Sequence, residues 1–145
     1  MIALLQRVTR AEVTVAGVSC GAIGTGLLAL IGVRPDDDDT TVARLLERIL
    51  AYRLFSDQAG RMNRCLAEVG GGLLLVPQFT LAADTRKGNR PGFQAAAEPT
   101  LARRLFEELV ARARGLHTLV ACGPFGADMQ VSLVNDGPVT VWLES

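Results

Sequence analysis

An unbroken apolar run lies in the first quarter of the chain: Leu27-Leu28-Ala29-Leu30-Ile31-Gly32-Val33. A run of this length without polar positions is typical of a buried strand. A second run, Leu73 to Val76, follows three glycines and stops at Pro77, and it predicts another buried strand. The two runs therefore predict the buried centre of a sheet.

Weaker strand patterns lie at both ends of the chain. Residues Ile2 to Val15 alternate loosely between apolar and polar side chains, which predicts a strand that bends and continues. Near the C-terminus, Met129 to Val134 and Val139 to Leu143 predict two strands joined at Asn135-Asp136-Gly137-Pro138. Taken alone, Asp-Gly between two strands favours a hairpin turn.

Two segments have helical periodicity. Val42, Leu45, Leu46, Ile49 and Leu50 form an apolar stripe, and a second stripe begins near Pro99 and ends at Gly115. The acidic run Asp36 to Asp39 precedes the first helix, where the helix dipole favours negative charge. We reject a metal site there because adjacent side chains rarely converge on one ion. The pattern predicts one α+β domain over residues 1–145.

Composition limits the partners. Hydrophobic residues make up 49% of the chain and charged residues 21%, so we expect surplus apolar surface to form a two-fold dimer interface. The net charge is zero, which argues against broad binding along a nucleic-acid backbone, although not against recognition of a nucleic-acid end in a local pocket. Lys87 is the only lysine among the 15 basic residues.

The cysteines and the apolar runs suggest where the protein resides. Cys20, Cys65 and Cys122 lack the spacing of zinc ligands, and we expect buried thiols in a reducing cytosol. No signal peptide and no apolar run of membrane-spanning length is evident. A soluble, cytoplasmic protein is expected.

Catalytic side chains are scarce. His117 is the only histidine, and no motif for a nucleophile or a metal accompanies it, so a structural histidine is favoured. Two other segments are candidates. Gln78-Phe79-Thr80 follows a buried strand, where backbone N–H groups leave the ladder. Gly137-Pro138 lacks one backbone donor, and its bond has a real chance of being cis. Each segment alone is more often a simple turn.

Together these segments resemble, in order, the bacterial and eukaryotic D-aminoacyl-tRNA deacylase family. The resemblance spans essentially the whole chain. It is carried by Leu5-Gln6-Arg7-Val8, Tyr52-Arg53-Leu54-Phe55-Ser56-Asp57, Met62-Asn63, Gln78-Phe79-Thr80-Leu81-Ala82, Arg90-Pro91, Ala127-Asp128-Met129-Gln130-Val131 and Asn135-Asp136-Gly137-Pro138-Val139-Thr140. Any one motif is weak, but the ordered set is specific.

The resemblance implies a mostly antiparallel, barrel-like sheet with two main helices. It also implies a homodimer that hydrolyses the ester between a D-amino acid and tRNA, and that removes glycine mischarged on tRNA-Ala. Aminoacyl-tRNA would be the partner, with no cofactor, metal, membrane or DNA involved. The Gly137-Pro138 motif would adopt a cis bond and enter the active site of the other subunit. There it would hold the substrate's ammonium group and leave no room for an L side chain.

The resemblance also assigns roles to single residues. Gln78, Phe79 and Thr80 would surround the scissile ester, with backbone N–H groups near Phe79 facing the developing oxyanion. Thr80 would position the substrate, because nothing nearby in sequence activates its hydroxyl and the ribose 2′-hydroxyl of the tRNA can assist water. Met129 would lie near the same pocket, and Arg7 would hold the Gly-Pro loop.

The chain departs from the family at two positions. Pro77 stands where the family usually has Ser, and Gly92 stands where Ser usually follows Arg-Pro. A related group of animal deacylases with altered chirality preference also carries Pro-Gln at the first position. Pro77 suggests one alternative, a deacylase with relaxed chirality. A second alternative, from another functional class, is a non-catalytic nucleic-acid-binding dimer of the same fold.

Overall fold

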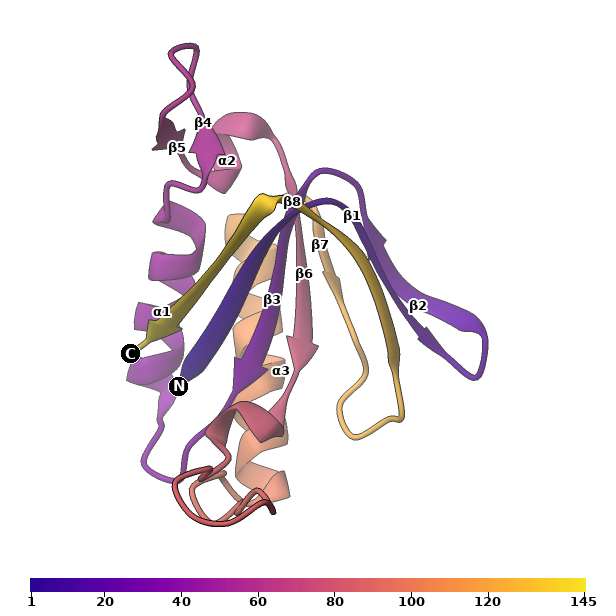
Figure 1. The fold of residues 1–145 in the computed structure, drawn as a ribbon, viewed down its shortest axis with the longest axis vertical. Coiled ribbons are helices and arrows are strands. Elements are labelled where there is room, and N and C mark those ends of the chain that lie inside the picture. The colour runs from indigo at the N-terminus through magenta and orange to yellow at the C-terminus, as the bar shows by residue number, and fades with distance from the viewer.

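One long strand, β1 (Ile2–Val15), is central to the sheet of the protein. The computed structural model describes residues 1–145. The other elements, in chain order, are β2 (Val18–Ile23), β3 (Gly26–Gly32), α1 (Asp39–Ala51), β4 (Phe55–Ser56), β5 (Met62–Arg64), α2 (Leu66–Val69), β6 (Gly72–Pro77), the 3-10 turn η1 (Phe79–Ala82), α3 (Pro99–Leu116), β7 (Val120–Cys122) and β8 (Gln130–Glu144). β1 pairs antiparallel with β2, β3 and β8, whereas β3, β6 and β7 run parallel (Figure 1). The sheet is therefore mixed.

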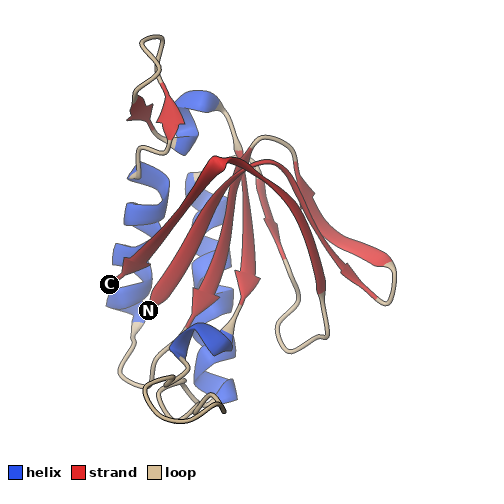
Figure 2. Ribbon diagram, viewed as in Figure 1, coloured by secondary structure: helices blue, strands red, loops and turns tan.

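The two long helices lie against one face of this sheet (Figures 1 and 2). Both predicted helices are confirmed, and each buries the apolar stripe that its periodicity indicates. The buried helical residues are Val42, Leu45, Leu46 and Ile49 of α1 and Ala102, Leu105, Phe106, Leu109, Val110 and Ala113 of α3. They pack against alternate residues of the central strands, among them Leu27, Leu73 and Leu75.

The sheet curls, as the α+β, barrel-like expectation requires. β1 pairs with β3 up to Val8 and with β2 from Ala11 onward, so the predicted bend in this strand is confirmed. Leu28 and Leu74 alternate with the helix-facing residues and belong to a second, smaller core on the opposite face. The two end strands of the sheet, β2 and β7, approach each other: a Cβ on Gly21 would lie only 3.0 Å from the Cys122 carbonyl oxygen. The sheet is therefore nearly closed.

The C-terminal segment is a single strand, and the hairpin favoured at Asn135-Asp136-Gly137-Pro138 is wrong. Both halves of β8 pair antiparallel with β1. Gln6 faces Thr140 and Val8 faces Asn135, so two steps along β1 correspond to five along β8, and the extra residues bulge out of the ladder. The chain does not reverse because β1 is long enough to pair with both halves.

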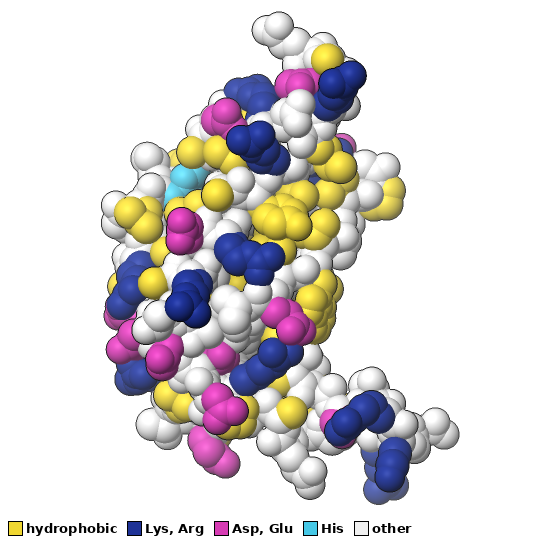
Figure 3. Space-filling view, turned by 90° about the vertical axis from the view of Figure 1, so that its left-hand side faces the viewer, with side chains coloured by type: hydrophobic (Ala, Val, Ile, Leu, Met, Phe, Trp, Pro, Cys, Tyr) yellow, Lys and Arg dark blue, Asp and Glu magenta, His cyan; other side chains and the backbone are white.

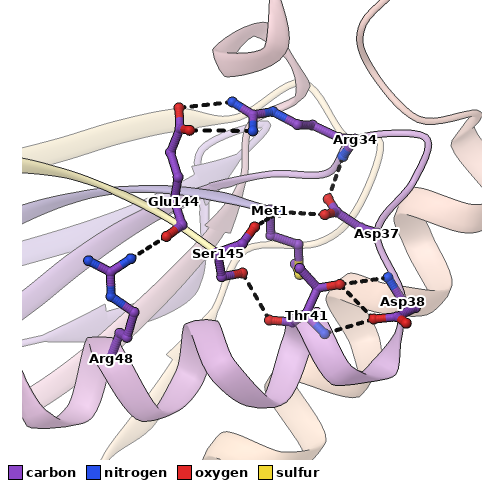
Figure 4. Close-up of polar contacts among 8 residues, drawn as sticks. All are labelled: Met1, Arg34, Asp37, Asp38, Thr41, Arg48, Glu144 and Ser145. Atoms are coloured by element: carbon purple, nitrogen blue, oxygen red, sulfur yellow. Dashed lines mark hydrogen bonds and ion pairs between the residues drawn. The ribbon is translucent and has the colours of Figure 1, made fainter.

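The acidic run lies at the start of α1, as predicted, and Asp37, Asp38 and Asp39 have separate partners, those of Asp37 and Asp38 being drawn in Figure 4. Asp38 is the N-cap: its carboxylate accepts a hydrogen bond from the Thr41 N–H at 2.8 Å, and the Thr41 hydroxyl accepts one from the Asp38 N–H at 2.9 Å. Hydrogen bonds from Thr41 lower the pKa of Asp38. Asp37 contacts the ammonium group of Met1, and Asp39 pairs with Arg104 at 2.7 Å.

The end of β8 is tied to the same region (Figure 4). The Glu144 carboxylate accepts hydrogen bonds from the Trp142 indole and from the Arg34 guanidinium, each at 2.9 Å, and these contacts lower its pKa. Arg48 of α1 donates to the Glu144 carbonyl oxygen, and the Ser145 hydroxyl donates to the Thr41 carbonyl at 3.1 Å. The end of β8 is therefore anchored to α1.

The expectation of buried thiols is wrong. Cys20 is exposed, because β2 borders the sheet and most of its side chains face solvent, and Cys65 and Cys122 are only partly buried. All three cysteines are free. No helix combines the length and the apolar character that a membrane crossing needs.

The parallel pairing of β3 with β6 depends on two glycines that face each other in register, Gly26 and Gly72. A Cβ on Gly26 would lie 2.0 Å from the Gly72 carbonyl oxygen, and a Cβ on Gly72 would lie 2.8 Å from the Ile23 side chain. A side chain at Gly26 would therefore force β3 and β6 apart, and one at Gly72 would displace the Ile23 side chain of β2. By contrast, a Cβ on nearby Gly24 would meet nothing within 4 Å.

We therefore predict that Gly26→Ala lowers the free energy of unfolding by at least about 2–3 kcal/mol, because the methyl group would overlap the backbone of β6. The matched control Gly24→Ala should change it by less than about 0.5 kcal/mol. Urea denaturation of both variants measures the difference. Equal stabilities for the two variants would contradict this account of the strand contact.

Candidate functional site

The first part of the candidate site is the end of β6, where the chain turns directly into η1. The Gln78 N–H makes the last ladder hydrogen bond, 2.7 Å to the Ile31 carbonyl oxygen. The N–H groups of Phe79 and Thr80 then have no acceptor, because a helical turn leaves its first N–H groups unpaired. Two adjacent backbone donors are thus available to an external oxygen atom.

A hollow of about 320 Å³ opens between this turn and the segment that follows β7. It is lined by Val76, Pro77, Gln78, Phe79, Phe125, Gly126, Ala127, Met129 and Val131. The structure thus places Gln78, Phe79 and Met129, three of the residues singled out in the sequence, around one hollow. Thr80 lies beside it in η1, whereas Arg7, Gly137 and Pro138 do not line it.

No ionisable side chain lines this hollow. Sequence reasoning missed one wall, Phe125, whose ring packs 6.3 Å from that of Phe106 and lies beneath the Arg103 guanidinium at 4.9 Å. The only signal for this wall was the turn-forming composition Gly123-Pro124-Phe125-Gly126, which does not indicate a binding surface. Chemistry in the hollow must therefore rely on backbone dipoles and on groups of the bound molecule.

Thr80 has no base beside it. Its hydroxyl accepts a hydrogen bond from the Gln78 side-chain amide, and this is its polar contact in the structure. His117 caps the end of α3, and its ring bonds the Gly71 carbonyl oxygen at 2.7 Å, at the opposite end of β6. Six residues of strand at about 3.3 Å each put that ring roughly 20 Å from the hollow. The Thr80 hydroxyl is therefore placed to orient a ligand, with no group to activate it as a nucleophile.

The second part of the candidate site is the bulge in β8. The Gly137-Pro138 bond is cis, and both residues are exposed. Arg7, whose side chain is only 13% exposed, approaches the bulge with its Nε 3.0 Å from the Asp136 carboxylate. The same guanidinium donates from Nη1 to the Leu54 carbonyl oxygen at 2.7 Å. Arg7 thus links the bulge to the segment after α1.

The bulge has further internal support that sequence reasoning did not identify. The Asn135 side chain accepts a hydrogen bond from the Val139 N–H at 3.2 Å and donates to the Thr140 hydroxyl at 2.8 Å. Gly137 has a φ of +115°, a conformation that favours glycine, and a Cβ there would lie 2.9 Å from the Arg7 guanidinium. The shape of the protruding main chain is therefore held by Asn135 within the bulge and by Arg7 beneath it.

The two parts of the site lie at opposite ends of the sheet. Val8 faces both Asn135 of β8 and Gly26 of β3, and Gly26 in turn faces Gly72 at the start of β6. The hollow lies beyond Pro77, at the other end of β6 (Figure 1). At about 3.3 Å per residue this separation is roughly 20 Å, so one chain cannot bring its own bulge to its own hollow.

A larger hollow, of about 780 Å³, lies among the helices. Its walls come from α1, α2 and α3, and most are apolar, including Leu46, Leu50 and Leu116. Of its polar side chains, Arg112 pairs with Glu108 at 2.5 Å and His117 bonds the Gly71 carbonyl, whereas Glu47 forms no ion pair. We therefore place the candidate site at the smaller hollow, which lies next to the free backbone donors of Phe79 and Thr80.

Comparison with known proteins gives full-length matches. A family model described as D-Tyr-tRNA(Tyr) deacylase matches residues 4–144. A protein of Thioalkalivibrio sulfidiphilus named D-aminoacyl-tRNA deacylase is 67% identical over 144 residues, which cover 99% of this chain and 97% of the relative. A protein of the same name from Azotobacter vinelandii is 61% identical over 145 residues, which cover 100% of both chains.

Two solved structures are similar in fold. One is named c-Myc DNA Unwinding Element Binding Protein. It is 38% identical with a TM-score of 0.95, and the match covers 100% of this chain and 99% of that one. The other is described as a probable eukaryotic D-amino acid tRNA deacylase. It is 17% identical with a TM-score of 0.86, and the match covers 99% of this chain and 98% of that one.

Proposed function

The chain belongs to the D-Tyr-tRNA(Tyr) deacylase family, and from this premise we propose that it removes D-amino acids, and glycine mischarged on tRNA-Ala, from tRNA while rejecting L-amino acids. It is an enzyme that hydrolyses the ester bond of aminoacyl-tRNA. The observation that carries the proposal is the full-length identity of 67% to a D-aminoacyl-tRNA deacylase. The uncharged hollow with two free backbone donors supports it.

Hydrolysis in this hollow would use the main chain. The ester carbonyl would lie against the N–H groups of Phe79 and Thr80, which then stabilise the oxyanion that forms when water attacks. Because no ionisable side chain lines the hollow, the proton of the attacking water would pass through a group of the substrate to the ribose 3′-oxygen, which leaves as the acyl C–O bond breaks. The ribose 2′-hydroxyl next to the ester is in position to assist. Thr80 and Gln78, joined by their hydrogen bond, would orient the ester.

Selection between D- and L-amino acids would come from a second subunit. The bulge at Gly137-Pro138 protrudes from one end of the sheet and is held by Arg7, yet it cannot reach the hollow of its own chain. A homodimer with a two-fold axis would place each bulge against the partner's hollow. Main-chain atoms of the bulge would then fill the space that the side chain of an L-amino acid needs. A D-amino acid or glycine carries only a hydrogen atom there and would still fit.

An unpaired strand edge supports the dimer. β8 pairs only with β1, so its outer edge is free along all 15 residues, which is unusual in a monomer. Val134 and Trp142 on this strand are 41% and 47% exposed. A second copy seated on this strand would cover these side chains and would also lie close to the bulge.

Two alternatives remain distinct from this proposal. Pro77 lines the hollow, and a proline there in place of serine favours relaxed chirality. A DNA-binding role is stated in the name of one structural relative, at 38% identity. Release of amino acid from D-aminoacyl-, glycyl- and L-aminoacyl-tRNA separates all three. We expect hydrolysis of the first two only; hydrolysis of all three supports relaxed chirality, and hydrolysis of none supports a binding role.

The first prediction concerns the mechanism. Thr80→Ala should keep hydrolysis within about tenfold of wild type, because its hydroxyl only orients the substrate. Replacing the terminal ribose of the tRNA by its 2′-deoxy form should cost at least about a hundredfold, the range of a lost general acid or base. Single-turnover rates on D-aminoacyl-tRNA test both, with Thr80→Ser as the control that keeps the hydroxyl. A loss of about four orders of magnitude in Thr80→Ala would identify a nucleophile instead.

A second prediction concerns the bulge. Gly137→Ala should lower D-aminoacyl-tRNA hydrolysis by about a hundredfold, because a displacement of about an ångström at a positioning element has that effect. The control is Gly60→Ala, since Gly60 also has a positive φ of +77° but has open space around its Cβ position. Thermal unfolding should show a larger loss of stability for Gly137→Ala, because only its methyl group meets Arg7 and Val139, while both variants remain folded at the assay temperature. Near-normal turnover by Gly137→Ala would mean that the bulge is merely a turn.

Mixing two defective variants tests the shared site. Gly137→Ala would damage the bulge, and Ala127→Phe would fill the hollow. In a random mixture half of the dimers carry one defect on each subunit, and each such dimer regains one intact site, which gives about a quarter of wild-type activity. Co-refolding followed by the deacylation assay measures this. If the mixture is no more active than its components, each site is built within a single chain.

A further inference from the structure

A basic loop lies next to the candidate site, between η1 and α3, at residues 84–94 (the basic loop below; Figure 1). An isolated bridge closes it: the Asp84 N–H donates to the Gly92 carbonyl at 2.7 Å, and the Gly92 N–H donates back to the Asp84 carbonyl at 3.0 Å. Inside this closure the side chains of Arg86, Lys87 and Arg90 gather. Basic side chains stand out on the protrusion at the lower end of the molecule (Figure 3).

The positive charge of the basic loop is only partly neutralised. Arg86 forms two hydrogen bonds with the single acidic side chain of the loop, from Nε to Oδ1 of Asp84 at 2.9 Å and from Nη2 to Oδ2 at 2.7 Å. These bonds lower the pKa of Asp84 and raise that of Arg86. Asp84 is thus committed to Arg86, and Lys87 and Arg90 form no ion pair in the structure.

These side chains surround a polar hollow of about 440 Å³. It is lined by Asp84, Arg86, Lys87, Arg90, Gly92 and Gln94, with no hydrophobic residue among them. Elsewhere many arginines are occupied: Arg7, Arg34, Arg103, Arg104 and Arg112 each pair with a carboxylate. Several other arginines, among them Arg44, Arg53 and Arg61, also form no ion pair, so this hollow is distinguished by its place beside the candidate site and not by charge alone.

An aromatic contact joins this polar hollow to the candidate site. Phe93 follows Gly92 of the loop, and its ring lies 5.0 Å from that of Phe79, which lines the smaller hollow. The two rings are 40% and 55% exposed. Exposed aromatic faces beside basic groups suit a single-stranded nucleic acid, because bases stack on the rings while phosphates meet the charges. The chain has no aromatic-basic stripe in sequence, but folding creates this local cluster.

From this juxtaposition we propose that the basic loop is a phosphate-binding subsite for the single-stranded acceptor end of the tRNA substrate, with Lys87 and Arg90 as its phosphate contacts. This inference rests on the proposed function, because it assumes that the terminal nucleotide enters the hollow beside Phe79. The phosphates that precede this nucleotide would then reach Lys87 and Arg90, and Arg86, held by Asp84, would shape the floor of the subsite. Phe93 would support the neighbouring base.

Binding of uncharged tRNA tests the proposal without depending on hydrolysis. Lys87→Gln and Arg90→Gln should each weaken binding about fivefold, and the double variant about 25-fold, as expected for exposed charge contacts that act independently. The slope of log affinity against log salt should fall by about 0.7 for each contact removed, the value for a single strand. Fluorescence polarisation of 5′-labelled tRNA, which leaves the 3′ end free to enter the hollow, measures both quantities, and Lys87→Arg should retain most of the binding.

The matched control is Arg44→Gln, which removes an exposed arginine of α1 that is outside the loop and forms no ion pair. A double variant that binds within twofold of wild type, or an equal loss in Arg44→Gln, would overturn the proposal. In kinetics on D-aminoacyl-tRNA the loop variants should raise KM and leave kcat within about twofold. Wild-type protein that binds tRNA through the loop but hydrolyses no D-aminoacyl-tRNA would instead refute the proposed function and leave the loop assignment standing.

Discussion

The hydrogen bonding of β1 to three other strands is the constraint on which the rest of the structure depends. Because β2, β3 and β8 all take their register from it, a single strand fixes which residues lie at each end of the sheet. Its length explains why β8 continues past the bulge instead of reversing. It also explains why Arg7 lies beneath the bulge: Arg7 belongs to the short part of β1 that the bulge leaves without a partner in β8.

Local features of the fold could be predicted from the sequence, and features that depend on distant pairing could not. The runs at Leu27–Val33 and Leu73–Val76 and the helical stripes follow from periodicity within one element, so they were predictable. The parallel contact at Gly26 and Gly72, the approach of β2 to β7 and the single strand β8 each require knowledge of which segment lies alongside which. The burial of Cys20 was predicted from the number and spacing of the cysteines, whereas its exposure follows from its place on β2, a border strand.

The same distinction applies to the candidate site. Gln78, Phe79 and Thr80 could be selected because a strand end frees backbone donors, and the family resemblance supplied Met129 and Arg7. Phe125 could not be selected, since its place beside the hollow arises only when the segment after β7 folds over the end of β6. That the bulge and the hollow lie at opposite ends of one chain became apparent only from the register of the strands.

The absence of ionisable side chains around the hollow has an evolutionary consequence. Where recognition and chemistry rest on reactive side chains, a single codon change can remove or redirect them. Here the working groups would be peptide units, which every amino acid possesses, so most substitutions cannot delete them. New selectivity in such a lineage would arise by reshaping turns, through gains and losses of glycine and proline or through changes in loop length. Pro77 is a difference of this kind, and it lies on the wall of the hollow.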